Sequence, residues 1–192
     1  MLGFVNIVVH HLINRCGDKM KLLFAIHKYD VFMFSWLINA SIHDSLARIS
    51  RYISKTGDGQ LYVLVMVLFY WHDGFRSQAL QAMLLAFAIE RPTYFVLKNG
   101  FRRNRPEAAL KNFHSYIKPS DKFSFPSGHT SAAFMMAALL GHFFPFLLLP
   151  LCCWAGLVGF SRVVLGVHFP TDILVGCVMG VSIAFFSIGQ II

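Results

Sequence analysis

The sequence is poor in charged residues, and in acidic ones above all. Charged side chains make up 14% of the 192 residues, with 9 Asp and Glu against 17 Lys and Arg. Soluble domains average about 25% charged residues, so this composition argues against a purely water-soluble protein. Intrinsic disorder is excluded as well, because 56% of the residues are hydrophobic and 20 of them are Phe. The composition therefore predicts an integral membrane protein.

Cysteine is scarce too, and its spacing excludes several kinds of site. Cys16, Cys152, Cys153 and Cys177 form no C-x-x-C pair and no Cys/His pattern typical of zinc. We therefore predict neither a disulfide nor a metal site. The sequence also lacks internal repeats and low-complexity tracts.

The N-terminus lacks a basic region followed by a small-residue cleavage site, so it does not have the pattern of a secretory signal peptide. Residues 1–16 are apolar but are interrupted by His10 and His11. We interpret residues 1–30 as an interfacial amphipathic segment of a single membrane domain, which extends over residues 1–192.

The excess of basic residues indicates an anionic partner. The formal net charge is +8. This sign fits anionic lipid, a phosphorylated substrate or nucleic acid, and charge alone does not choose among them.

Apolar segments of uneven length predict an all-α integral membrane fold, a bundle of six transmembrane helices. The first is expected to join the apolar residues 31–40 to the amphipathic residues 41–54 as one tilted helix. Residues 98–128 are rich in basic side chains and are predicted to form an extramembrane loop that carries part of the site. The predicted spans are residues 31–54, 61–71, 79–97, 130–149, 151–167 and 171–192.

The third predicted span contains Glu90, Arg91 and Pro92. Charges at membrane depth are costly unless they are paired or face the protein interior. An internal ion pair or a helix end near the interface would explain them, and the sequence assigns them no chemical role.

The connections after the first, third and fifth spans lie on one face of such a bundle. Residues 98–125, the start of the fourth span and residues 167–172 are therefore predicted to meet there. The residues that could bind a ligand or take part in catalysis lie in these same connections.

These residues form three short clusters: residues 98–106, Pro-Ser-Gly-His at residues 126–129, and residues 161–172. Guanidinium groups match the oxygen edges of phosphate. Ser127 is placed to cap a helix whose unpaired amides would face an anion. A phosphoryl group is therefore the predicted ligand. The residues expected to hold it are Lys98, Arg103, Arg105, Ser127, Gly128 and Arg162.

The third cluster also contains a candidate nucleophile. His168 and Asp172 are four residues apart, and Pro170 between them fits the first turn of the sixth span. A carboxylate at this position would hold one imidazole N–H and leave the other nitrogen free to attack phosphorus. His129 is then the candidate general acid for the leaving oxygen. This set needs neither a metal ion nor another cofactor.

The clusters resemble the signature of the type 2 phosphatidic acid phosphatase superfamily, K-x6-R-P, P-S-G-H and S-R-x5-H-x3-D, at every defining position from Lys98 to Asp172. The resemblance implies a six-helix bundle without a metal cofactor, and the vanadium haloperoxidases share this site. It also implies that His168 forms a phosphohistidine, that Asp172 orients His168, and that His129 protonates the leaving group. The residues that it implies for phosphate binding are Lys98, Arg105, Ser127, Gly128 and Arg162, with Arg103 assisting.

The resemblance implies a lipid phosphatase that forms a phosphohistidine. The leading candidate substrates are undecaprenyl pyrophosphate and phosphatidylglycerol phosphate, followed by phosphatidic acid. A phosphotransferase on the same site and a non-catalytic lipid-binding membrane protein are the alternatives. No nucleic-acid partner is expected, because the basic cluster lies between spans without a recognition module. The oligomeric state is left open.

The sequence gives conflicting signals about the side of the membrane on which the active site lies. The positive-inside rule alone would place the basic face in the cytoplasm. Several of those cations have a chemical reason to be there, however, and the resemblance favours an extracytoplasmic site for many bacterial members. We therefore predict a bacterial inner (plasma) membrane protein with its active site on the extracytoplasmic face.

Overall fold

A computed structural model describes residues 26–39, 43–110, 113–119 and 121–192, and in these ranges it contains helices and no β-strand. The N-terminal segment predicted over residues 1–30 therefore lies outside the described residues as far as residue 25. The described helices are residues 26–38, α2 (His43–Thr56), α3 (Gly59–Asp73), α4 (Gln78–Phe101), α5 (Pro106–Ala109), α6 (Gly128–Phe143), α7 (Leu148–Val164) and α8 (Pro170–Ile191), with the 3-10 turns η1 (Gly74–Arg76) and η2 (Pro145–Leu147).

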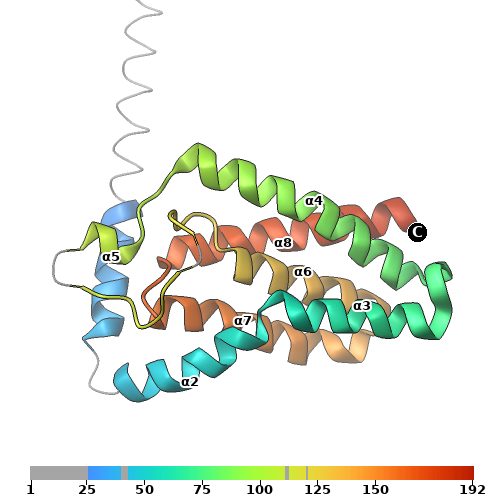
Figure 1. Ribbon diagram of the computed structural model, residues 1–192, viewed down its shortest axis with the longest axis horizontal. Coiled ribbons are helices and arrows are strands. Elements are labelled where there is room, and N and C mark those ends of the chain that lie inside the picture. The colour runs from blue at the N-terminus through green and yellow to red at the C-terminus, as the bar shows by residue number, and fades with distance from the viewer. Residues whose placement is uncertain (1–25, 40–42, 111–112, 120) are drawn as a thin grey trace, which may run out of the picture.

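The long helices run side by side between two ends of the molecule (Figure 1). Helix α6 packs against α4, α7 and α8, and α3 packs against α4. The end of α4, the start of α6, the end of α7 and the start of α8 share one end of the bundle, where the helix at residues 26–38 and α5 also lie (Figure 1). The predicted meeting of these connections is thus observed.

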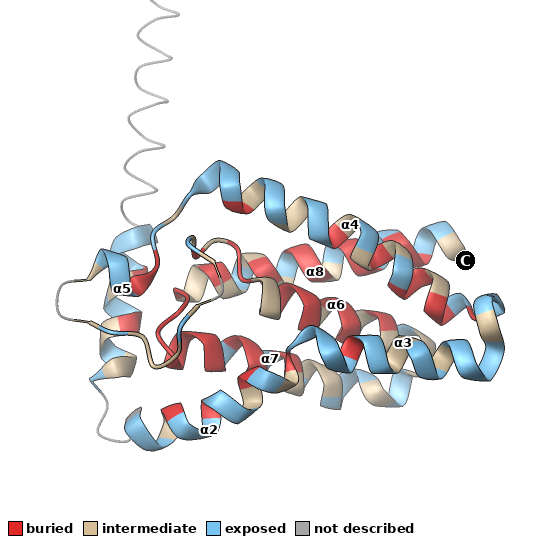
Figure 2. Cartoon of the chain, in the orientation of Figure 1, coloured by how far each residue is buried: buried red, intermediate tan, exposed pale blue. Residues whose placement is uncertain are grey.

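The surface of the bundle is suited to lipid. Three of the described helices are long and apolar enough to cross a membrane: Gln78–Phe101, Pro145–Val164 and Pro170–Ile191. Helix α3 is exposed along most of its length (Figure 2), and its exposed side chains include Val63, Leu64 and Val67. Apolar side chains on the outside of a helix are stable in lipid and costly in water. The protein is therefore an integral membrane protein of the all-α class, and the count of six spans stays a prediction.

Two glycines bring α8 close to α6. A Cβ on Gly180 would lie 2.1 Å from the Ser131 carbonyl oxygen, and one on Gly176 would lie 2.7 Å from that of Ser127. Small residues at such a contact let two membrane helices approach closely. The N-termini of the two helices are also tied together, because the Ser127 amide donates to the Asp172 carbonyl oxygen at 3.1 Å.

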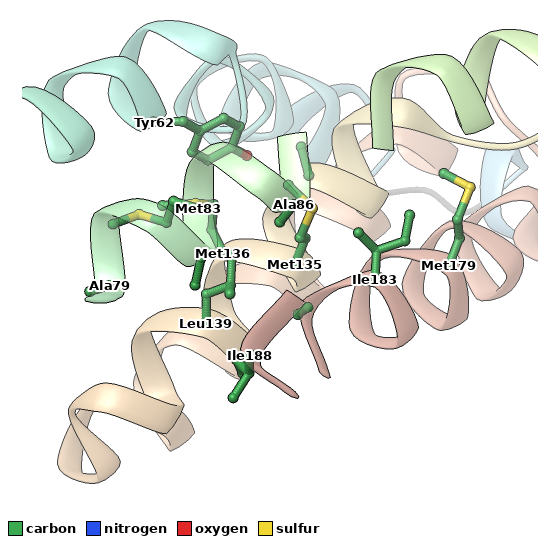
Figure 3. Packing of buried hydrophobic residues seen from close by; sticks show 13 residues of the cluster. Tyr62, Ala79, Met83, Ala86, Met135, Met136, Leu139, Met179, Ile183 and Ile188 are labelled. Atoms are coloured by element: carbon green, nitrogen blue, oxygen red, sulfur yellow. The ribbon is translucent and has the colours of Figure 1, made fainter. Parts of the chain in front are cut away.

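The largest apolar core lies farther along the same helices (Figure 3). Met83 on α4 and Met135 and Met136 on α6 are almost completely buried there, together with Leu139. Flexible, unbranched Met side chains fill irregular gaps between helices. This core fixes α4 and α8 on α6 and so positions the ends that carry the site.

The predicted first span is wrong in its course. The helix at residues 26–38 and α2 run in clearly different directions (Figure 1). Helix α2 carries Arg48, Arg51 and Lys55, and it lies at the end of the bundle that holds the site. Charged residues on three successive turns are costly inside a bilayer, so α2 is poorly suited to continue the apolar span that the sequence predicts.

Three other predicted boundaries also need correction. The third span ends at Phe101 instead of residue 97, because α4 continues past Pro92 and includes Lys98. The extramembrane loop therefore starts at Arg102 instead of residue 98. The fourth span ends at Phe143 instead of residue 149, since Pro145 starts a new turn and its ring disfavours helical backbone at the preceding residue.

Candidate active site

The three sequence clusters line one cavity of about 680 Å³ at the end of the bundle. Its polar wall includes Lys98, Arg105, Gly128, His129, Arg162 and His168. Apolar side chains of α3 and α4 also line it, among them Val63, Met66 and Phe87. Ser127, Asp172 and Arg103 are not among the lining residues. A cavity lined by both cationic and apolar side chains fits an amphiphile with an anionic head group.

His168 lies between α7 and α8 and is almost completely buried. Its Nδ1 is 3.6 Å from Oδ2 of Asp172, which also accepts the Phe169 amide at 2.8 Å. This separation is just beyond hydrogen-bond length, and Nδ1 has no other hydrogen-bond partner among the described residues. Catalytic hydrogen bonds are often long before substrate binds. The arrangement keeps Nδ1 next to Asp172 and leaves Nε2 for the cavity.

Burial determines the protonation state of His168. Desolvation lowers its pKa to about 3, against the opposing effect of Asp172, and Arg105 and Arg162 lower it further. The ring is therefore neutral near pH 7 and retains a lone pair, which a nucleophile needs.

Arg103 lies on the other side of Asp172 from His168. Its Nη1 donates to Asp172 Oδ1 and to Thr171 Oγ1, both at 2.7 Å, and its Nη2 donates to Asp30 Oδ2 at 2.5 Å. Asp30 is 1% exposed, and it also accepts the Thr171 amide at 3.0 Å. Arg103 thus contacts the carboxylate that faces the nucleophile, and it is absent from the cavity wall.

Lys98 and Arg105 share a carboxylate from the loop between α5 and α6. Lys98 Nζ is 2.7 Å from Asp121 Oδ2, and Arg105 forms an ion pair with Asp121 Oδ1. Tyr94 donates to Asp121 Oδ2 at 2.6 Å. Burial alone would raise the pKa of Asp121, but the hydrogen bonds from Lys98 and Tyr94 outweigh it and lower the pKa to about 2. An anionic oxygen therefore already lies between these two cations.

Arg162, in the last turn of α7, supplies the third buried cation. Its Nη1 donates to Ser54 Oγ at 2.6 Å, while its buried Nε has no hydrogen-bond partner among the described residues. A buried guanidinium N–H without a partner is energetically costly, and an anion in the cavity would satisfy it.

The start of α6 has the form that the sequence predicts. Ser127 is the N-cap, and its Oγ accepts the Thr130 amide at 3.4 Å. A Cβ on Gly128 would lie 2.8 Å from the Tyr94 ring, so glycine is needed for this close approach. The positive end of the α6 dipole therefore lies at the cavity wall.

His129 follows directly, and its Nε2 is 2.9 Å from Oδ1 of Asp58, the N-cap residue of α3. Asp58, His129 and Arg162 also line a second cavity of about 850 Å³. The wall of that second cavity is basic, with Arg48, Arg51, Lys55 and Lys118. His129 thus contacts both cavities.

Sequence reasoning missed several acidic partners of the site. Glycines flank Asp58, so its local pattern indicates only a turn, and Asp121 stands in a loop without periodicity. Asp30 lies far from the signature in the sequence, and no local pattern connects it to Arg103. Among the described residues, no group of three His, Cys, Asp or Glu side chains is arranged to hold a metal ion.

Comparison with known proteins agrees with this class of membrane protein. The family model of the PAP2 superfamily matches residues 61–191. Because the match covers more than half of the chain, the chain belongs to the PAP2 superfamily. The signature residues, from Lys98 to Asp172, fall within the matched stretch, whereas residues 57–60 of the cavity lining precede it.

Two of the individual relatives are bacterial phosphatases by name. Phosphatidylglycerophosphatase B of Bacillus subtilis is 37% identical over 118 residues, which are 56% of this chain and 55% of that protein. Decaprenylphosphoryl-5-phosphoribose phosphatase of Mycobacterium tuberculosis is 32% identical over 46% of this chain and 48% of its own length. The chain thus spans about half the length of these curated relatives.

Two solved structures share the fold. LpxE of Aquifex aeolicus superposes with a TM-score of 0.73 at 26% identity, over 83% of this chain and 94% of that one. The PAP2-type phosphatidylglycerolphosphate phosphatase of Bacillus subtilis gives a TM-score of 0.71 at 27% identity, over 86% of both chains.

Proposed function

We propose that this protein is a membrane lipid phosphatase that uses no metal ion and hydrolyses a lipid phosphate or pyrophosphate. One observation carries the proposal: a neutral buried histidine, His168, shares a cavity with three buried cations. Family membership and the phosphatases among the relatives support it. The leading substrates are phosphatidylglycerol phosphate and undecaprenyl pyrophosphate, followed by phosphatidic acid.

The apolar and the cationic lining residues of the cavity indicate where the two ends of the substrate bind. The lipid chain lies against the apolar side chains of α3 and α4, and the phosphate lies among Lys98, Arg105 and Arg162. The phosphate oxygens displace the Asp121 carboxylate from Lys98 and Arg105 and take up the unpartnered Nε of Arg162. Charge-assisted hydrogen bonds to phosphate are about twice as strong as neutral ones, which favours the exchange.

The first chemical step forms a phosphohistidine. Nε2 of His168 attacks phosphorus, and the bond from phosphorus to the lipid oxygen breaks in line with it. His129 gives a proton to the leaving oxygen, so the lipid product departs as an alcohol or as a monophosphate. Burial and the neighbouring Arg162 lower the pKa of His129 to about 4 in the empty site, and the bound phosphate supplies the negative charge that favours the protonated ring. Asp172 accepts a hydrogen bond from Nδ1–H and stabilises the positive charge that the phosphorylated ring acquires, while Arg103 holds Asp172 in place.

The second step returns the enzyme to its starting state. A water attacks phosphorus, the phosphorus–nitrogen bond breaks, and inorganic phosphate forms. His129, now neutral, takes the proton from that water. The second cavity, which also reaches His129, provides a polar route for the water.

The decisive experiment measures phosphate release from the three candidate lipids by purified protein in detergent with EDTA. Wild type should release phosphate, His168→Ala should release none, and His72→Ala should match wild type, since His72 is exposed on α3 outside the cavity. Activity in His168→Ala would contradict the mechanism. Phosphate below the amount of substrate consumed would indicate a phosphotransferase, and intact lipid with folded wild-type protein would indicate a binding protein.

We further propose that the site faces the extracytoplasmic side of a bacterial inner membrane. Glu107 lies on α5 at the same end of the bundle and is exposed. In a variant without native cysteines, Glu107→Cys should react with a membrane-impermeant maleimide in intact cells. Reaction only after the cells are permeabilised would place the site in the cytoplasm.

A further inference from the structure

Arg91 is a cation of the main cavity that the mechanism does not use. It lines the cavity together with Tyr94 and Lys98. These residues occupy positions i, i+3 and i+7 of α4 and therefore share one face of the helix. Arg91 also lies over the Tyr94 ring, with 5.3 Å from its guanidinium carbon to the ring centroid.

A buried acid fixes the position of Arg91. The Glu90 side chain is 0% exposed, whereas that of Arg91 is 54% exposed. Nε and Nη2 of Arg91 both contact Oε2 of Glu90. This leaves Nη1 without a hydrogen bond among the described residues, and Glu90 Oε1 is buried without a partner. An ion pair that served only to neutralise Glu90 would not need an open cavity beside its guanidinium.

The place of Arg91 along α4 indicates which part of a substrate it meets. Seven residues of helix separate it from Lys98, a rise of about 10 Å. Phe87, an apolar residue that lines the same cavity, is one helical turn beyond Arg91 on the side away from Lys98, so Arg91 lies between Lys98 and this apolar side chain. In a bound lipid, this is the stretch that joins the reacting phosphate to the acyl or prenyl chain.

We propose that Arg91 forms a second anion subsite, which selects lipids that carry a second phosphate on the lipid side of the one removed. The inference rests on the proposed phosphatase function. Guanidinium is the group best matched to phosphate, and at membrane depth an anion bound to it is little screened. Phosphatidylglycerol phosphate and prenyl pyrophosphates have such an inner phosphate and keep it in the product, whereas phosphatidic acid has none.

The test compares phosphatidylglycerol phosphate with phosphatidic acid of the same acyl chains in the same mixed micelles, and adds undecaprenyl pyrophosphate as a third substrate. The variant Glu90→Gln/Arg91→Gln removes both charges together, so that no buried charge is left unpaired. Its kcat/KM should fall about tenfold or more for the substrates with two phosphates and change less than about twofold for phosphatidic acid. Arg91→Lys should recover part of the loss.

Controls separate this inference from folding and from the proposed function. Arg76→Gln, in η1 outside the cavity, should leave all three rates unchanged. A loss confined to one of the two substrates with two phosphates would identify its phosphate as the ligand. Equal losses on all three substrates, or no loss on any, would overturn the subsite. Wild type without activity on any lipid would overturn the phosphatase function itself.

A second readout avoids turnover. Phosphatidylglycerol keeps the inner phosphate, whereas diacylglycerol lacks it. Inhibition by phosphatidylglycerol should weaken about tenfold in Glu90→Gln/Arg91→Gln, and inhibition by diacylglycerol should not change. If both products bind equally well to wild type and variant, Arg91 does not contact the inner phosphate.

Discussion

Arg103 donates a 2.7 Å hydrogen bond to Asp172 and, through its other terminal nitrogen, a 2.5 Å bond to Asp30. Two buried carboxylates therefore hold one guanidinium, and one of these carboxylates faces His168. Because Asp30 lies in the helix at residues 26–38, the nucleophile is supported from a part of the chain that precedes the family signature by almost seventy residues.

Asp30→Asn should lower kcat about tenfold and leave KM within about twofold, because the outer partners of a catalytic group orient it without touching substrate. Asp73→Asn, on the exposed end of α3, is the matched control and should be silent. Steady-state kinetics on phosphatidylglycerol phosphate checks both. A rise in KM with unchanged kcat would show that Asp30 acts on substrate binding instead.

Asp121→Asn should tighten the binding of inorganic phosphate several-fold. In the empty site the Asp121 carboxylate pairs with Lys98 and Arg105, so an incoming anion must displace it. An amide competes less well for the two cations, which are then freer to bind phosphate. The inhibition constant of inorganic phosphate measures this effect. Weaker inhibition would mean that Asp121 holds the two cations in their binding positions.

The buried His168 should make folding stability depend on pH. Its pKa is lowered to about 3 in the folded protein, against its ordinary value of 6.5. Between these values the unfolded chain binds a proton that the folded protein does not, so stability falls as the pH drops from about 6.5 toward 3. Above pH 6.5 neither state binds this proton, and the effect vanishes.

His168→Gln removes that titration, so its Tm should fall less than that of wild type between pH 7 and pH 4.5. The exposed His114→Gln should behave like wild type and serves as the control. Thermal unfolding in the same detergent measures all three proteins. Equal slopes for wild type and His168→Gln would show that folding does not lower the pKa of His168.

Two glycines of α8 should respond in opposite directions. Gly180→Ala places a Cβ 2.1 Å from the Ser131 carbonyl oxygen, and such overpacking costs about 1–3 kcal/mol. Gly189→Ala meets no atom within 4 Å and should stabilise the helix by about 0.5–1 kcal/mol. Thermal unfolding of the two variants measures the difference, and an unchanged Tm for Gly180→Ala would contradict the close approach of α6 and α8.

The sequence predicts the fold well where apolar periodicity and proline act together. It places the N-cap Ser127 and the first-turn Pro170 correctly, because caps and first turns have local chemical signatures. It is less accurate at helix ends without such a signal. The third span is predicted to end at residue 97, whereas α4 continues to Phe101 and includes Lys98.

The site was predictable in its outline because the signature residues lie at helix ends that the topology brings together. Its partner residues were not. Asp30, Asp58 and Asp121 act through contacts across the bundle, and a single acidic residue in a turn or a loop has no pattern that names its partner. The role of Arg103 also follows only from the three-dimensional structure. In the sequence it belongs to the basic cluster, whereas in the structure it contacts the carboxylates of Asp172 and Asp30.

The two cavities that meet at His129 offer the lipid and the water of the proposed reaction separate access routes. The first opens along apolar side chains of α3 and α4, and the second is lined by Arg48, Arg51 and Lys55. A lipid that arrives sideways from the bilayer and a water that arrives from the aqueous side need not pass each other. In the proposed reaction, the released inorganic phosphate would be attracted to the basic residues of the second cavity, and the apolar product would return along the first. Such an arrangement would separate the two products by their solubility.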